Sequence, residues 1–193
     1  MWRTTGGVLL TAWCSSAVGV EPIPPTPFEA FATRADVVVR EAALVGALQS
    51  ADSVATFTTL VLEDSDGTRK IGLRIDLQSN TATDSVYLDQ AEIVLAKREL
   101  GELVDGTPSL LHPSDDGGAP WRTQGTGRCW DPEPEQRILC PSFNVGPDRV
   151  SLTLGALGGP YFSFPEHSPP ELMALIETAS NDLATKSTGR SPQ

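Results

Sequence analysis

The sequence predicts an α+β protein made of two units, each an antiparallel β-meander followed by a helix that covers the sheet. Two observations predict this fold. Apolar and polar residues alternate strictly over 71–77 and again over 150–156, as in strands with one buried face. A helix start signal follows each alternating stretch, at residues 89–92 and at residues 168–171. Because each sheet has one apolar face and each helix one apolar stripe, we expect them to pack together.

The first nineteen residues are typical of a secretory signal peptide. Arg3 supplies a positive charge, residues 6–13 form a short apolar run, and small residues follow up to Gly19. Cleavage is expected after Ala17 or after Gly19. The apolar run is shorter than the roughly 20 residues that span a bilayer, so no membrane span is expected from it. The protein is therefore expected in the periplasm or outside the cell.

A lipid anchor at Cys14 competes with simple release. Lipidation prefers an aliphatic residue three positions before the cysteine and a small residue just before it, but Thr11 and the bulky Trp13 occupy these positions. The anchor is therefore disfavoured. No Asn-x-Ser/Thr sequon occurs in the chain, which favours a bacterial source over a eukaryotic secreted protein.

The first unit spans residues 28–104 and follows a Pro-rich leader at residues 20–27. Residues 28–49 are ambiguous, because Val37 to Val39 favour a strand whereas residues 40–44 favour a helix; we expect a helix over much of this segment. The other elements follow in order: strands at 54–62, 71–77 and 86–88, a hairpin turn at Asp66-Gly67, and a helix from Asp89 to about Val104 with Ile93, Ala96, Leu100 and Leu103 on its apolar stripe.

A linker is predicted at residues 105–120, rich in Gly, Pro, Ser and Asp. The second unit, residues 121–184, repeats the order of the first, which is typical of an internal duplication but also arises by chance. A flexible tail is expected at residues 185–193. The expected elements are strands at 137–140, 150–156 and 161–164, a turn at 158–160, and a helix after Ser168 with Leu172, Leu175, Ile176, Ala179 and Leu183 on its stripe.

The chain is acidic, with 14 basic and 25 acidic residues and a net charge of −11. Removal of residues 1–19 takes away Arg3 and no acid, so the net charge becomes −12. Nucleic acids and anionic lipids bind through clustered Lys and Arg, so we do not expect either as a partner. The acidity favours a basic protein partner, or serves solubility alone.

Two cysteines, Cys129 and Cys140, remain after removal of the signal peptide. A pair of cysteines in an exported protein is typical of a disulfide, which would stabilise the fold by about 3 kcal/mol for a loop of this class. The rival interpretation is a metal or redox pair. Neither a C-x-x-C spacing nor a nearby histidine favours it.

The segment between these cysteines is a candidate binding loop. It contains Trp130 and three acids, Asp131, Glu133 and Glu135, and two prolines stiffen it. A stiff loop loses less entropy on binding, which would suit contact with a basic partner protein. The alternative is a disulfide-closed hairpin whose acids are simply solvated.

The sequence carries no established catalytic motif. It lacks a G-x-S-x-G elbow and a phosphate-binding loop, and its two histidines, His112 and His167, are explained by a solvated loop and by a helix start. No cofactor and no metal are therefore expected. The favoured function is a non-enzymatic protein-binding module of the bacterial envelope, of inhibitor or immunity type. The alternatives are a secreted hydrolase that uses carboxylates and a structural envelope protein.

Overall fold

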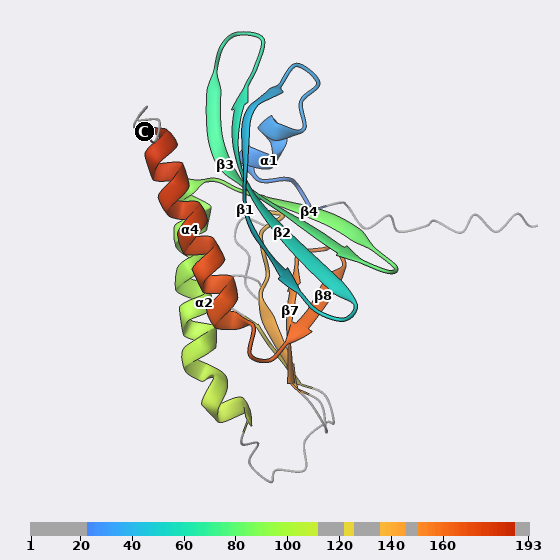
Figure 1. The fold of residues 1–193 in the computed structure, drawn as a ribbon. Coiled ribbons are helices and arrows are strands. Elements are labelled where there is room, and N and C mark those ends of the chain that lie inside the picture. Colours follow the sequence, from blue (N-terminus) through green and yellow to red (C-terminus); the bar gives the residue numbers. More distant parts are fainter. Residues whose placement is uncertain (1–22, 112–121, 126–135, 146–149, 188–193) are drawn as a thin grey trace, which may run out of the picture.

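The computed structural model describes residues 23–111, 122–125, 136–145 and 150–187. These residues form an α+β protein with two four-stranded antiparallel sheets, which confirms the predicted fold class. Two long helices lie side by side along one side of the sheets (Figure 1). Four strands and then a helix occur in each half of the chain, but this shared order does not show a duplication.

The first sheet contains β1 (Val38–Gln49), β2 (Ser53–Glu63), β3 (Arg69–Ser79) and β4 (Thr83–Leu88), in that order. The predicted turn at Asp66-Gly67 connects β2 with β3. Gly67 has a φ of 81°, a conformation that glycine adopts without strain. The Asp64 carboxylate accepts hydrogen bonds from the backbone N–H of Asp66 (3.0 Å) and of Thr68 (2.8 Å), and these bonds fix the turn.

The alternating pattern of β3 is confirmed over residues 73–77. Leu73, Ile75 and Leu77 are at most 1% exposed, whereas Arg74 and Asp76 on the opposite face are partly exposed and joined by an ion pair of 2.9 Å. Over these residues one face of the strand contributes to the core and the other contacts water. Gly72, which the pattern places on the water-facing side, is buried.

The prediction of a helix over much of residues 28–49 is wrong. The helix α1 covers only Pro27–Ala32, and Thr26 caps it by accepting a hydrogen bond of 3.2 Å from the Glu29 N–H. The rest of the segment is β1, which pairs with β2 along its whole length. The β-branched residues Val38 and Val39 start this strand, and the sheet overrides the helix propensity of residues 40–44.

The predicted capping box at the start of α2 (Gln90–Leu111) is confirmed. The Asp89 carboxylate accepts from the Glu92 N–H at 2.8 Å, and the Glu92 carboxylate accepts from the Asp89 N–H at 2.7 Å. Ile93, Ala96 and Leu100 are buried on the predicted stripe. The helix continues past Val104, so residues 105–111 of the predicted linker are helical.

The second sheet contains β5 (Arg122–Gly125), β6 (Ser142–Val145), β7 (Val150–Gly155) and β8 (Tyr161–Pro165), in that order. Leu152 and Leu154 are fully buried, as the alternation predicts, and Gly158 has the φ of 77° that a tight turn needs. The prediction of a strand at residues 137–140 is wrong. Of these residues, Leu139 alone takes part in β-pairing, through an isolated bridge with Ala156.

Helix α4 (Pro169–Ser187) begins directly after Ser168, as predicted. The Ser168 carbonyl accepts the first helical hydrogen bond from the Leu172 N–H at 2.9 Å. The helix includes residues 185–187, which the sequence assigns to the tail. The buried residues on its stripe are Leu172, Ile176, Ala179 and Leu183, whereas Leu175 is only partly buried.

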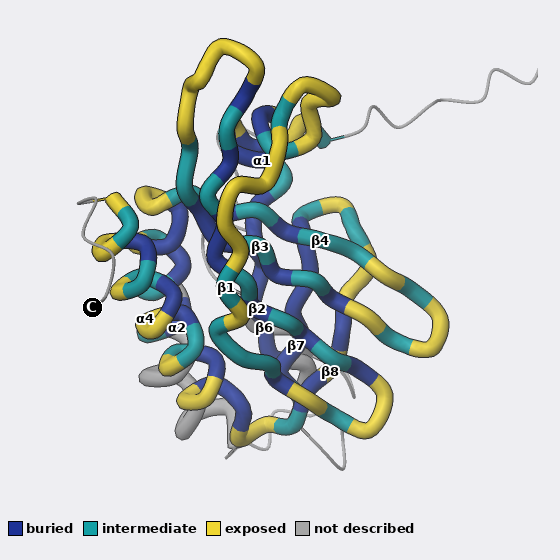
Figure 2. The backbone as a smooth tube through the Cα atoms, turned by 45° about the horizontal axis from the view of Figure 1, so that its top comes forward, coloured by how far each residue is buried: buried dark blue, intermediate teal, exposed yellow. Residues whose placement is uncertain are grey.

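One hydrophobic core extends through both sheets and both long helices. Figure 2 shows buried positions in both sheets and on the inner sides of α2 and α4. The two predicted units therefore do not form separate cores. The core includes Phe57, Leu73 and Ile75 of the first sheet, Phe143, Leu152 and Phe162 of the second, Ile93 and Leu100 of α2, and Leu172 and Ile176 of α4.

A smaller cluster lies on the other face of the first sheet, where Phe28 and Phe31 of α1 pack against Leu60 and Leu62 of β2. Gly72 of β3 makes this close packing possible. A Cβ atom at this position would overlap the Phe28 ring and would lie 2.6 Å from the carbonyl oxygen of Leu88. The absence of a side chain thus lets α1 lie directly on the sheet.

Candidate functional site

Most of the predicted site lies outside the described residues. Cys129, Trp130, Asp131, Glu133 and Glu135 belong to this undescribed part of the chain. Cys140 is described and is 2% exposed. The disulfide and the acidic binding loop therefore stay predictions.

The described residues 136–141, which we call the stem segment, include the C-terminal end of the predicted loop. The Arg137 N–H donates to the carbonyl of Pro24 at 2.8 Å, and the Cys140 N–H donates to the carbonyl of Gly155 at 2.8 Å. The carbonyl of Ile138 accepts from the Leu157 N–H at 2.9 Å. These bonds attach one end of the predicted loop to the N-terminal leader and to the region after β7.

A partly buried charge cluster holds the stem segment against the first half of the chain. The Arg137 guanidinium donates to the Glu29 carboxylate at 2.5 Å, to the Asp84 carboxylate, and to the Ser85 carbonyl at 3.1 Å. Burial lowers the pKa of Arg137, but the hydrogen bonds with Asp84 and Glu29 raise it, and the pKa lies above its ordinary value. One guanidinium thus joins α1, β4 and the stem segment.

In each of the two carboxylates, one oxygen accepts a hydrogen bond from Arg137 and the other does not. Glu29 Oε2 and Asp84 Oδ2 are buried and have no hydrogen-bond partner in the described part of the chain. The cluster consists of two acids around one cation. This arrangement makes the folded state depend on Arg137, because loss of the cation would leave two carboxylates close together without compensation.

The strand β1 is the exposed edge of the first sheet. No described strand lies beside its outer edge, so no described strand pairs with the backbone N–H and C=O groups there. The side chains of Val38, Val39 and Leu44 are also exposed, by 49%, 56% and 71%. Figure 2 shows this exposed stretch at the start of β1. Register shifts at Arg40 and at Val45 mark irregularities in the strand.

A second charge cluster holds β1 and β2 against the end of α4. The Lys186 ammonium contacts Glu41 at 2.8 Å, Asp182 at 3.0 Å and the Thr59 hydroxyl at 3.1 Å. Burial lowers the pKa of Lys186, but the bonds with Glu41 and Asp182 raise it above its ordinary value. Gly46 lies under Leu175 of the same helix. The inner face of β1 is therefore fixed by α4, while no described strand lies beside its outer edge.

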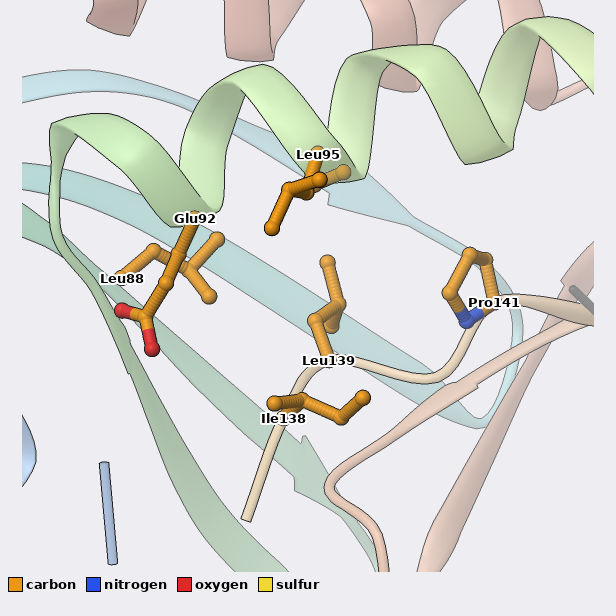
Figure 3. Close-up of a pocket in the computed structure, with 7 residues that line it drawn as sticks. Leu88, Glu92, Leu95, Ile138, Leu139 and Pro141 are labelled. Atoms are coloured by element: carbon orange, nitrogen blue, oxygen red, sulfur yellow. The ribbon is translucent and has the colours of Figure 1, made fainter. Parts of the chain in front are cut away.

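Figure 3 shows a small cavity between α2 and the stem segment. Its lining is apolar except for Glu92, and its volume of about 20 Å³ is in the range of a single water molecule. It is therefore too small for a ligand. Two larger hollows are open to solvent. One of about 300 Å³ lies between α1, β3 and the start of α2, and one of about 620 Å³ lies between the ends of the two sheets.

A single carboxylate lines each of these three spaces, namely Glu92, Asp89 and Asp52. Within the described ranges, no group of three or more His, Cys, Asp or Glu side chains could hold a metal ion.

No helix in those ranges is both long and apolar enough to cross a bilayer. Comparison with known proteins yields no assignment, since no family model and no curated protein matches the chain.

Sequence reasoning missed two features of the described structure. The edge strand β1 was not predicted, because residues 40–44 have high helix propensity. The partners of Arg137 could not be found, because Glu29 and Asp84 lie 108 and 53 residues away in the chain. The only available signal was that Arg137 is a lone base in an otherwise acidic segment.

Proposed function

We propose that the chain is an exported acidic protein of the bacterial envelope that acts by binding another protein, as an inhibitor or immunity-type partner. The observation that carries this proposal is the open edge of β1. Natural sheets usually protect their edges with charged residues, bulges or a covering element. The strand β1 has two register irregularities and carries Arg40 and Glu41, but it also exposes Val38, Val39 and Leu44 beside an edge that has no described strand partner. An extended segment of a partner can add to such an edge as a further strand.

The charge of the chain supports a basic partner. Its net charge of −11 attracts positively charged surfaces over distances of about 10 Å, so that it speeds association and favours such partners. The acidic segment 131–135 would add to this attraction. The anchored stem segment favours its presentation on the fold, because Arg137 and Cys140 hold one end of it in place.

Replacement of Leu44 by Lys tests the edge. Leu44 is 71% exposed, so Leu44→Lys should leave the fold intact while a charge is placed beside the edge. We expect at least a tenfold weaker capture of a discrete protein from envelope extract, measured with the immobilised protein after removal of residues 1–19. The matched control is Val94→Lys on α2, where the side chain is 61% exposed and the charge change is the same.

If the Leu44→Lys and Val94→Lys variants captured the partner equally well, the proposed role of β1 as the binding edge would be contradicted. Capture of a further copy of the chain in place of a different protein would instead favour the structural envelope protein. Both outcomes are visible in the same experiment, because the captured species is identified by mass.

Charge reversal tests the acidic segment separately. The triple variant Asp131→Lys, Glu133→Lys, Glu135→Lys should weaken capture, and the loss should shrink as salt is raised, because exposed charges are screened. The control is the same reversal at Asp52, Asp66 and Glu166, which lie at exposed positions in turns. Equal effects of the two triple variants would show that only net charge matters and that segment 131–135 has no special role.

A further inference from the structure

A polar groove lies where the ends of the two sheets meet. Residues 50–53 between β1 and β2, residues 79–81 between β3 and β4, and parts of β7 and β8 line a space of about 620 Å³. This volume is within the range of roughly 300–1,000 Å³ that small-molecule sites occupy. The groove lies apart from the exposed side chains at the start of β1, so its function is independent of the proposed protein contact.

A hydrogen bond between the two sheets fixes the shape of the groove. The Ser50 hydroxyl donates to the carbonyl of Ser163 in β8 at 2.9 Å, and the same Ser50 oxygen accepts from the Ser53 N–H at 3.0 Å. The turn at 79–82 is fixed in a similar way, since the Ser79 hydroxyl accepts from the Ala82 N–H at 3.1 Å. Both turns are therefore preorganised, which lowers the entropy cost of binding.

The groove presents free polar groups and one exposed aromatic ring. The side chains of Asp52, Asn80 and Ser151 make no hydrogen bond within the described part of the chain and line the groove. Tyr161, also in the lining, is 53% exposed, whereas Phe164 beneath the groove is 2% exposed. A solvent-exposed tyrosine side chain offers a flat apolar face together with a hydroxyl group.

The charge of the described lining favours a class of ligand. Among the described residues that line the groove, none is Lys, Arg or His, and Asp52 is the one carboxylate. Phosphates, sulfates and nucleic acids would meet no cation from these residues. A peptide that adds to the edge strand β8 would compete with the Ser50 hydroxyl, which already uses the Ser163 carbonyl. The described polar groups and the Tyr161 ring suit a neutral ligand with many hydroxyl groups and one apolar face.

We propose that this groove binds a neutral oligosaccharide of two or three units, such as a segment of an envelope glycan. One sugar ring stacks its C–H face on Tyr161. The hydroxyl groups of the bound units exchange hydrogen bonds with Asp52, Asn80 and Ser151, which line the groove. Carboxylate, amide and hydroxyl groups together supply both donors and acceptors, as sugar hydroxyls require.

The test is a titration of the ¹⁵N-labelled protein with chitotriose and with cellotriose, two neutral trimers that differ in their N-acetyl groups. We expect saturable amide shifts at residues 50–53, 79–82 and 161–165 with one trimer or both, at a Kd of about 1 mM or tighter. Tyr161→Ala should weaken binding about tenfold or more. Tyr161→Phe keeps the ring and should bind within about threefold of the wild type.

Three results would overturn the proposal. The first is the absence of saturable shifts with both trimers at up to about 10 mM, tenfold above the expected Kd. The second is a set of shifts centred away from these residues, and the third is binding that Tyr161→Ala leaves unchanged. The spectrum of each variant without sugar shows whether the fold is intact. Leu44→Lys should bind the sugar as the wild type does, which separates this site from the protein-binding surface.

Discussion

Replacement of Arg137 by Ala is expected to destabilise the fold by about 3 kcal/mol. The change leaves the Glu29 and Asp84 carboxylates facing each other without the guanidinium that both contact. Their side chains are only 8% and 13% exposed, so water compensates little of the lost interaction. The free energy of unfolding from urea titration measures the effect. We take the lower end of the usual range because the Arg137 side chain itself is 23% exposed.

The matched control is Arg40→Ala. Arg40 also pairs with a carboxylate, that of Glu63 at 2.7 Å, but its side chain is 56% exposed. An exposed pair contributes about 0–1 kcal/mol, so this variant should be near the wild type. A combined variant, Arg137→Met with Glu29→Gln and Asp84→Asn, should recover part of the loss because it removes the uncompensated charges. A cost of less than about 1 kcal/mol for Arg137→Ala would show that the cluster contributes no more than a surface ion pair does.

Phe143→Ala is expected to have an effect of similar size, about 3–5 kcal/mol. Phe143 lies in β6 of the second sheet, is 0% exposed and belongs to the core shared by both sheets. Truncation therefore opens a cavity in a region that also supports the first sheet. We expect backbone amides of β3 and β7 to lose hydrogen-exchange protection together, by the same free energy.

The control for this variant is Val94→Ala on α2. Its side chain is 61% exposed, so its stability should stay within about 0.5 kcal/mol of the wild type. If Phe143→Ala lowered protection in β7 and left β3 unchanged, the two sheets would unfold as separate lobes. That result would contradict a single cooperative core.

Local patterns in the sequence predicted local structure well. The alternation over 71–77, the Asp66-Gly67 turn and the capping box of Asp89 and Glu92 depend on contacts between residues close in the chain. The same explains the start of α4 after Ser168. Prediction failed where tertiary contacts decide the structure. Residues 40–44 have helix propensity, yet they lie in a strand because β2 offers a partner along their whole length.

The candidate sites show the same limit more strongly. The groove at the sheet ends combines residues 50–53 with residues 161–165, which are adjacent only because the sheets pack against each other. No spacing in the sequence indicates that arrangement. The acidic segment 131–135 was visible in the sequence because its residues are consecutive. A contiguous loop can be found in this way, whereas a site assembled from several turns cannot.

The cluster around Arg137 has a consequence for the order of events during folding. Glu29 and Asp84 belong to the first half of the chain, whereas their shared cation arrives with the second half. The early half alone would have to bring two negative charges together in a nonpolar setting, which is costly. The first half of the chain therefore lacks the cation that both acids contact in the complete fold. The Arg137 contacts become possible only when the later sequence is present.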